Sequence, residues 1–260
     1  MADSDYETRF GGIGRLYGAS ALSRFRRAHV CIIGVGGVGS WVVEALARSG
    51  IGAMTLVDLD DVCVSNVNRQ LPALDPHFGR PKVEVLAERV QAINPQCKIT
   101  TLPIFFTAET AAEILATPFD YVVDAIDSVS NKTLLITACR ARSLPVVVAG
   151  SAGGRRDPTA LRVDDLARAS NDPLLKIVRK KLRSEHGFPD ALQKSMGVEC
   201  VYSPEPVVFP QKDGSVCPMR DRDSDLKLTC EGGYGTATHL TGAFGFVLAG
   251  VVLRRLAEAA

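Results

Sequence analysis

The sequence contains no Cys-x-x-Cys pair, and its seven cysteines are scattered and odd in number. This pattern argues against a disulfide framework and against a four-cysteine zinc site, so we expect no zinc. A reducing cytoplasm is the compartment that suits such a sequence. The first thirty residues are polar and hold Asp3, Asp5 and Glu7, so they do not read as a secretory signal. Charge of one sign is not in excess either, since the formal net charge is +1. A nucleic-acid surface would therefore have to be a local patch.

No apolar run reaches the length of a membrane span. The most apolar stretch, Leu240–Leu253, has fourteen residues, whereas a span takes about 20. Its glycines suit close helix packing. We therefore expect a buried helix of the core or of a subunit interface and no membrane anchor, with peripheral membrane association left open.

Up to residue 150, short apolar runs alternate with helical patterns. The chain has 260 residues and 46% of them are hydrophobic, which is ample for a sizeable core. We expect one or two short helices within 5–27, then strands at 29–34, 54–58, 98–103, 121–125 and 145–150, with helices at 40–50, 81–94, 108–116 and 132–142. This alternation predicts an α/β fold with a doubly wound, mostly parallel, Rossmann-like sheet.

After residue 150 the alternation ends. Residues 151–170 are expected to add strands, 173–186 to form a basic helix, 203–225 to form a long loop with at most a hairpin, and 237–259 to close the chain as a helix.

A glycine-rich turn, GVGGVG, joins the first predicted strand to the first predicted helix. Its glycines are Gly34, Gly36, Gly37 and Gly39. Such glycines let the backbone approach a phosphate closely, and the helix amino terminus offers free N–H groups to it. Asp58 ends the next strand, where a carboxylate can accept hydrogen bonds from a ribose. These features suit both NAD and ATP.

Polar residues at and beyond the strand ends favour ATP over NAD. They are Asn66, Arg69, Gln70, Lys82 and Asp127. Two cations at the expected phosphate site suit a triphosphate, and Asp127 could hold Mg²⁺ through few protein carboxylates. Asp60 is a second acid beside Asp58, and it either helps with the metal or braces Arg69. No acid or base for a nicotinamide half-site follows.

The motifs GVGGVGS, VDLDDVCVSNVNRQ, RPK and DAID together resemble the ubiquitin-activating-enzyme superfamily, whose bacterial members are ThiF/MoeB-like adenylyltransferases. The resemblance covers about residues 10–150. It implies that Asp58 holds the ribose, that Asp127 positions Mg²⁺ and the nucleotide, and that three residues contact the triphosphate: Asn66, Arg69 and Lys82. Arg15 matches an amino-terminal arginine that reaches the partner subunit's active site in this superfamily, which implies a homodimer.

The carboxyl-terminal half departs from the members that activate sulfur carriers, which bind zinc through cysteine pairs. Its segments AGSAGGRRDPT, VYSPEP and GGYGTATHLTGAFGF, with RFGGIGRLYG near the start, resemble instead the branch that dehydrates N6-threonylcarbamoyladenosine beside the anticodon of tRNA. The resemblance implies that ATP activates the threonine carboxylate as an acyl adenylate and that the neighbouring carbamoyl group then closes a ring. That chemistry needs no catalytic cysteine, so Cys200, Cys217 and Cys230 are expected to be packing cysteines or to lie near the loop by chance. The alternative is a thioester-forming cysteine, which relatives use, and Cys230 is its candidate. A monovalent cation and a cysteine-desulfurase or sulfur-acceptor partner stay open.

The tRNA-facing residues are expected in the second half. Lys176, Arg179, Lys180 and Arg183 share one helix face. A basic helix face is usually only solvated, but with the resemblance we expect a phosphate-binding surface that includes Arg155 and Arg156. The expected organisation is one domain over 1–260, with an ATP-binding core at 1–150 and a part facing tRNA and the dimer partner at 151–260.

Three alternatives remain at this point. One is an adenylyltransferase that activates the carboxyl terminus of a ubiquitin-like sulfur carrier, which the missing cysteine pairs disfavour. A second is an NAD-dependent oxidoreductase. The third is a non-catalytic scaffold, which should have lost Arg69, Lys82 or Asp127, and all three are present.

Overall fold

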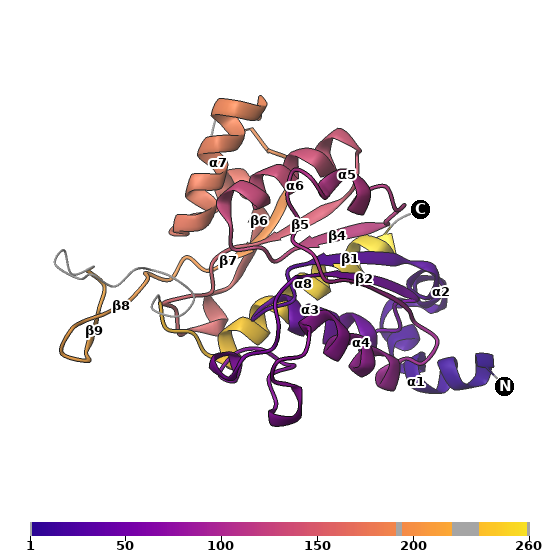
Figure 1. Cartoon of the computed structure of the whole chain (residues 1–260). Coiled ribbons are helices and arrows are strands. Elements are labelled where there is room, and N and C mark those ends of the chain that lie inside the picture. The colour runs from indigo at the N-terminus through magenta and orange to yellow at the C-terminus, as the bar shows by residue number, and fades with distance from the viewer. Residues whose placement is uncertain (1, 191–193, 220–233, 259–260) are drawn as a thin grey trace.

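A seven-stranded sheet with helices on both faces forms the framework of the molecule (Figure 1). The computed structural model describes residues 2–190, 194–219 and 234–258. The strand order is β3-β2-β1-β4-β5-β7-β6. The strands are β1 (His29–Ile33), β2 (Ala53–Val57), β3 (Lys98–Leu102), β4 (Tyr121–Asp124), β5 (Val146–Ala149), β6 (Arg162–Asp165) and β7 (Glu199–Tyr202). Neighbouring strands are parallel except for β6, which is antiparallel to β7. The predicted α/β fold with a doubly wound, mostly parallel sheet is confirmed.

Helices pack on each face because alternate strand residues point to opposite sides of the sheet. In β1, Val30 and Ile32 join one apolar cluster, while Cys31 and Ile33 join the other. The first cluster is covered by α2 (Ala19–Arg27), α3 (Gly39–Arg48), α4 (Lys82–Ile93) and α8 (Thr238–Glu258), with α1 (Ala2–Tyr17) outside them. The opposite face carries α5 (Ala111–Ile114), α6 (Val129–Ala141) and α7 (Pro173–His186). The strands and helices predicted before residue 150 are therefore present, with shifted ends and a shorter α5.

The apolar run near the carboxyl end is part of a core helix. By length and composition α8 could cross a membrane, but 61% of its most apolar window is buried inside the protein. Phe244 and Leu248 are fully buried, and the helix packs against α2 and α3. Gly245 lies so close to α3 that a Cβ there would stand 2.6 Å from the Trp41 Cβ. The expectation of a buried core helix is confirmed.

The sheet extends by two strands beyond β5, and one of them was not predicted. β7 lies between β5 and β6, so the chain forms the edge strand before the strand next to it. The sequence at β7, ECVY, is too short and irregular to reveal a strand by periodicity. Within the described residues, the remaining short elements are the β8–β9 hairpin (Phe209–Pro210 and Val216–Cys217) and the 3₁₀ helices η1 (Val64–Asn66), η2 (Asp75–His77), η3 (Pro158–Ala160) and η4 (Leu166–Arg168).

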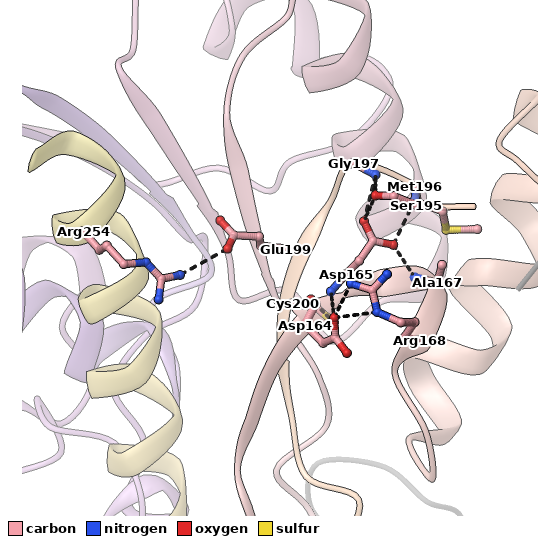
Figure 2. A network of polar contacts seen from close by, with 10 residues as sticks. All are labelled: Asp164, Asp165, Ala167, Arg168, Ser195, Met196, Gly197, Glu199, Cys200 and Arg254. Atoms are coloured by element: carbon pink, nitrogen blue, oxygen red, sulfur yellow. Dashed lines mark hydrogen bonds and ion pairs between the residues drawn. The ribbon is translucent and has the colours of Figure 1, made fainter. Parts of the chain in front are cut away.

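A buried carboxylate fastens the end of β6 to the loop that precedes β7 (Figure 2). Asp165 accepts hydrogen bonds from the Ser195 hydroxyl at 2.5 Å and from the backbone N–H groups of Ala167, Met196 and Gly197 at 2.9 Å each. Burial raises the pKa of the Asp165 carboxyl, but these hydrogen bonds outweigh burial and hold the pKa below its usual range. The two added strands are thus anchored by one ionised side chain.

Candidate active site

A cleft of about 730 Å³ opens at the carboxyl ends of the parallel strands. Strand order reverses between β1 and β4, which is where doubly wound sheets bind ligands. Most of the lining comes from the glycine turn, segment 57–82, the turn after β4, loop 149–153 and the start of α8, and further lining comes from residues 104–106, the start of α7, Val207 and Tyr234. Residues far apart in the chain therefore meet in one cleft.

The glycine turn has a shape that only glycine permits at two positions. Gly34 has φ +84°, and a Cβ there would stand 2.9 Å from the Ala125 carbonyl oxygen. A Cβ at Gly39 would stand 1.8 Å from the Gly34 carbonyl oxygen. Gly34, Gly36 and Gly37 line the cleft, whereas Gly39 begins α3 behind them. No side chain caps the amino terminus of α3. The N–H groups of Ser40 and Trp41 already donate to the carbonyl oxygens of Gly36 and Val38, so a phosphate would be held by N–H groups of the turn that precedes them.

Asp58 braces the glycine turn as well as facing the cleft. Its Oδ2 accepts from the Val35 N–H at 2.8 Å and its Oδ1 from the Asp60 N–H at 2.9 Å. Burial raises the pKa of the Asp58 carboxyl, and the nearby Lys82 charge and these hydrogen bonds offset only part of that rise. Each carboxylate oxygen can accept a second hydrogen bond, so capacity for ribose hydroxyls remains.

Lys82 is the most buried cation of the cleft. Its Nζ lies 2.8 Å from Asp60 Oδ2, with 5% of the Lys82 side chain and 55% of the Asp60 side chain exposed. Asp60 therefore braces Lys82, and the expectation that it braces Arg69 is wrong. Arg69 Nη1 donates instead to the carbonyl oxygen of Ser65 and to Asn68 Oδ1.

Two of the three side-chain amides of the SNVNRQ segment, Asn66 and Gln70, line the cleft. Asn66 Oδ1 accepts from the Cys63 N–H at 3.1 Å, which leaves its Nδ2 hydrogens as donors toward the cleft. Gln70 is 8% exposed, and its Oε1 has no hydrogen-bond partner among the residues that the structure describes. A buried polar atom without a partner costs free energy. A bound ligand or its water would relieve that cost.

Asp127 lies in the turn between β4 and α6, on the wall facing the glycine turn. Sequence reasoning missed its neighbours Ser128 and Asn131, which also line the cleft. They follow the end of β4 directly, so the strand-end rule that selected Asp127 could have found them.

The start of α8 completes the cleft from the far end of the chain. Thr241 lines the cleft, and its Oγ1 donates to the Arg69 carbonyl oxygen at 3.3 Å. Thr238 Oγ1 donates to the Asn68 carbonyl oxygen at 2.6 Å, and Asn68 Nδ2 donates to the Thr236 carbonyl oxygen at 2.9 Å. No local sequence signal could pair these segments, because they are about 170 residues apart.

Arg15 lies outside this cleft. It is exposed near the end of α1 and is not among the residues that line the cleft of its own chain. Its action across a subunit interface stays a prediction.

The predicted basic surface divides into exposed and buried members. Lys176, Lys180 and Arg156 are exposed. Arg179 and Arg183 are half-buried and donate to backbone carbonyl oxygens of the neighbouring segments.

The assignment of Arg155 to that surface is wrong. Its residue exposure is 2%, and its guanidinium lies against the Asp172 carboxylate, with Nη2 to Oδ2 at 3.6 Å. Arg155 also donates to the carbonyl oxygens of Ser151 and Asn171. Arg155 therefore ties the cleft loop to the start of α7.

Cys200 and Cys217 lie apart from the cleft. Cys200 is buried in β7, where burial raises the pKa of its thiol, and a thiol of this kind is a poor nucleophile. Cys217 belongs to β9 and is not among the lining residues. Cys230 lies outside the described residues.

A doubly wound sheet with a glycine turn, an acidic strand end and two cations at one cleft defines a nucleotide-binding enzyme of the adenylating class. The chain belongs to the ThiF family, which it matches over residues 12–254. It is 46% identical over 252 residues to the tRNA threonylcarbamoyladenosine dehydratase of Escherichia coli (strain K12), covering 96% of this chain and 94% of that protein. The dehydratase of Haemophilus influenzae is 44% identical, covering 97% and 94%. The solved structure of the E. coli enzyme in complex with ATP has a TM-score of 0.86 at 44% identity, covering 96% of this chain and 94% of that chain.

Proposed function

We propose that this protein is an ATP-dependent enzyme that dehydrates N6-threonylcarbamoyladenosine in tRNA through an acyl adenylate. The observation that carries the proposal is the cleft itself, in which the glycine turn, the ribose acid Asp58 and the cations Arg69 and Lys82 converge. The similarity to tRNA threonylcarbamoyladenosine dehydratases extends over both halves of the chain, which supports this substrate over a sulfur-carrier protein.

The reaction has two steps, and the residues of the cleft assist the first. The threonine carboxylate attacks the α-phosphate of ATP and pyrophosphate leaves, while N–H groups of the glycine turn hold phosphate oxygens. Arg69, Lys82 and the Asn66 amide neutralise and orient the phosphates as charge develops. The neighbouring carbamoyl group then attacks the activated carbonyl, the ring closes and AMP leaves, with net loss of one water. This second step is intramolecular, so it needs little acid–base help.

Mg²⁺ fits the donor set of the cleft, and we propose Asp127 as its protein ligand. Protein-bound Mg²⁺ usually takes one or two carboxylates together with substrate phosphates. Asp127 lines the cleft in the turn that follows β4, and Ala125 of the same turn packs against Gly34 of the glycine turn. The bound ion would neutralise phosphate charge.

The tRNA surface, the dimer and the domain organisation are further parts of the proposal. We propose that Lys176, Lys180 and Arg156 face tRNA phosphates. Arg15 would reach the partner's cleft in a homodimer, and the protein would act in the cytoplasm. The sheet runs without interruption from β1 to β7, which supports one domain over 1–260.

The test is direct. The protein is incubated with ATP, Mg²⁺ and tRNA carrying N6-threonylcarbamoyladenosine, and the nucleosides are then analysed by mass spectrometry. We expect a nucleoside lighter by one water, with pyrophosphate and AMP released in equal amounts. The same tRNA without the modification serves as control. Pyrophosphate exchange stimulated by a ubiquitin-like sulfur carrier, and not by modified tRNA, would establish the alternative adenylyltransferase function.

A further inference from the structure

An ion pair lies beneath the cleft without forming part of its lining. Asp124 ends β4 and Lys132 lies near the start of α6; both side chains are 0% exposed, with Nζ to Oδ1 at 2.8 Å. Neither residue is among those lining the cleft. Burial raises the pKa of the Asp124 carboxyl, and the Lys132 charge opposes that rise. Because desolvation of a buried pair offsets much of its attraction, such a pair contributes little net stability compared with apolar residues.

Asp124 and Lys132 hold both ends of the turn that carries Asp127. Asp124 Oδ1 accepts from the Ile126 N–H at 3.0 Å, at the start of that turn, and from Lys132 Nζ in the helix that follows it. The Lys132 N–H in turn donates to the Ser128 carbonyl oxygen at 2.9 Å. One carboxylate oxygen therefore fixes the turn 125–128 relative to both β4 and α6.

Displacement of this turn would reach the nucleotide site. The Ala125 carbonyl oxygen lies so close to Gly34 that a Cβ on the glycine would stand 2.9 Å from it. The Ala125 Cβ would lie 3.4 Å from a Cβ on Gly39, where α3 begins. The turn and the phosphate-binding glycines are thus packed backbone to backbone and cannot shift independently.

We propose that Asp124 and Lys132 are positioning residues, which hold the turn 125–128 and with it Asp127 in place for adenylate formation without touching the substrate. This inference rests on the proposed function, because the use of ATP in the cleft is what makes the placement of Asp127 matter.

The experiment compares Lys132→Met with Leu135→Ala in the 260-residue chain. Leu135 is also fully buried in α6, but it packs in the apolar cluster and does not line the cleft. Both variants lose stability, which thermal unfolding measures. If Lys132 positions the turn, Lys132→Met lowers kcat for pyrophosphate release about 10²-fold, the cost of a misplacement near 1 Å, while Leu135→Ala stays within about threefold of the wild type. Equal losses of kcat in the two variants would show that Lys132 serves stability alone.

A double variant with no charge at either position distinguishes an effect on stability from an effect on positioning. It also provides a test if Lys132→Met does not fold. The double variant Asp124→Asn with Lys132→Met keeps an acceptor for the Ile126 N–H and leaves no buried charge. Its melting temperature is expected to exceed that of Lys132→Met, since an unpaired buried charge is gone, while its kcat stays low because the grip on α6 is lost. Recovery of kcat together with stability would overturn the proposal.

Amide hydrogen exchange tests the same proposal and needs no substrate. The double variant loses the Lys132 hydrogen bond, so the turn should open more often and the Ile126 amide should exchange faster than in the wild type, even though an acceptor for this amide remains. Leu135→Ala should leave the exchange of Ile126 relative to neighbouring β4 amides unchanged. If the wild type releases no pyrophosphate with modified tRNA, the proposed function fails, and the exchange experiment still decides whether the pair holds the turn. Unchanged exchange at Ile126 in the double variant would overturn the positioning role.

Discussion

Replacing Lys82 by methionine should slow adenylate formation strongly while leaving the fold nearly intact. The Lys82 side chain is 5% exposed, so its charge acts on the phosphates through little solvent. At about 4 Å and an effective dielectric constant of about 20, two unit charges interact by about 4 kcal/mol. Because about 1.4 kcal/mol corresponds to a factor of ten in rate, the ceiling for the loss is about 10³-fold.

The nearby carboxylate lowers that ceiling. Asp60 Oδ2 stands 2.8 Å from Lys82 Nζ and neutralises part of its charge in the ground state. The Asp60 side chain is 55% exposed, so water also solvates its charge and the carboxylate neutralises only part of the Lys82 charge. We expect kcat/KM to fall about 10²-fold, the size found when one donor to a developing oxyanion is removed.

The assay is steady-state pyrophosphate release with ATP and modified tRNA, alongside thermal unfolding. Lys98→Met is the matched control, since Lys98 is an exposed lysine at the start of β3, at the other end of the sheet. Loss of an ion pair with a half-exposed partner changes stability little, so the melting temperature of Lys82→Met should stay near that of the wild type. A decrease below about fivefold in kcat/KM, or a decrease matched by Lys98→Met, would refute the electrostatic role of Lys82.

Three further predictions concern stability and tRNA binding. Asp165→Asn should destabilise the protein by about 2 kcal/mol at neutral pH; because the folded pKa of Asp165 is lowered, that stability is present above the unfolded pKa of about 3.9 and lost as pH falls through the folded value. Urea unfolding of both proteins from pH 7 downward checks this, and a gap between them that does not shrink in acid would contradict it. Arg155→Met should cost about 3–5 kcal/mol, since it leaves the buried Asp172 carboxylate without its cation; a loss measured by urea unfolding that matches an exposed Arg156→Met control would contradict the buried role. Changing Lys176 and Lys180 to glutamate should weaken binding of modified tRNA, with a loss that shrinks as salt rises; filter binding at two salt concentrations measures it, and unchanged affinity at low salt would remove these lysines from the tRNA surface.

The sequence predicted the first part of the fold well because its signals are local. Five strands and the helices between them follow short apolar runs and helical periods, which neighbouring residues determine. β7 escaped prediction because its position between β5 and β6 is set by pairing with strands distant in the chain. Four residues give no periodicity from which to infer such a strand.

The sequence likewise predicted only part of the candidate site. Asp58, Asn66, Lys82 and Asp127 could be grouped from the sequence, because carboxyl ends of parallel strands meet at one edge of a sheet. The partner of each side chain could not be inferred, since Asp60 joins Lys82 across a turn whose path the sequence does not specify. The burial of Arg155 could not be inferred from the sequence either. Arg155 and Arg156 are adjacent arginines with no sequence difference between them, yet Arg155 is buried and Arg156 is exposed.

The position of α8 has a consequence for synthesis of the protein on the ribosome. The helix completes the apolar cluster under β1 and β2, and Thr241 and Thr238 hold the backbone of the segment that carries Arg69. When only the glycine turn and the first five strands have emerged from the ribosome, the nascent chain exposes the apolar face that α8 later covers. The segment that carries Arg69 then also lacks its hydrogen bonds to Thr238 and Thr241. ATP affinity should then appear only once α8 has emerged and docked, and until then the exposed apolar face would make the growing chain prone to aggregation.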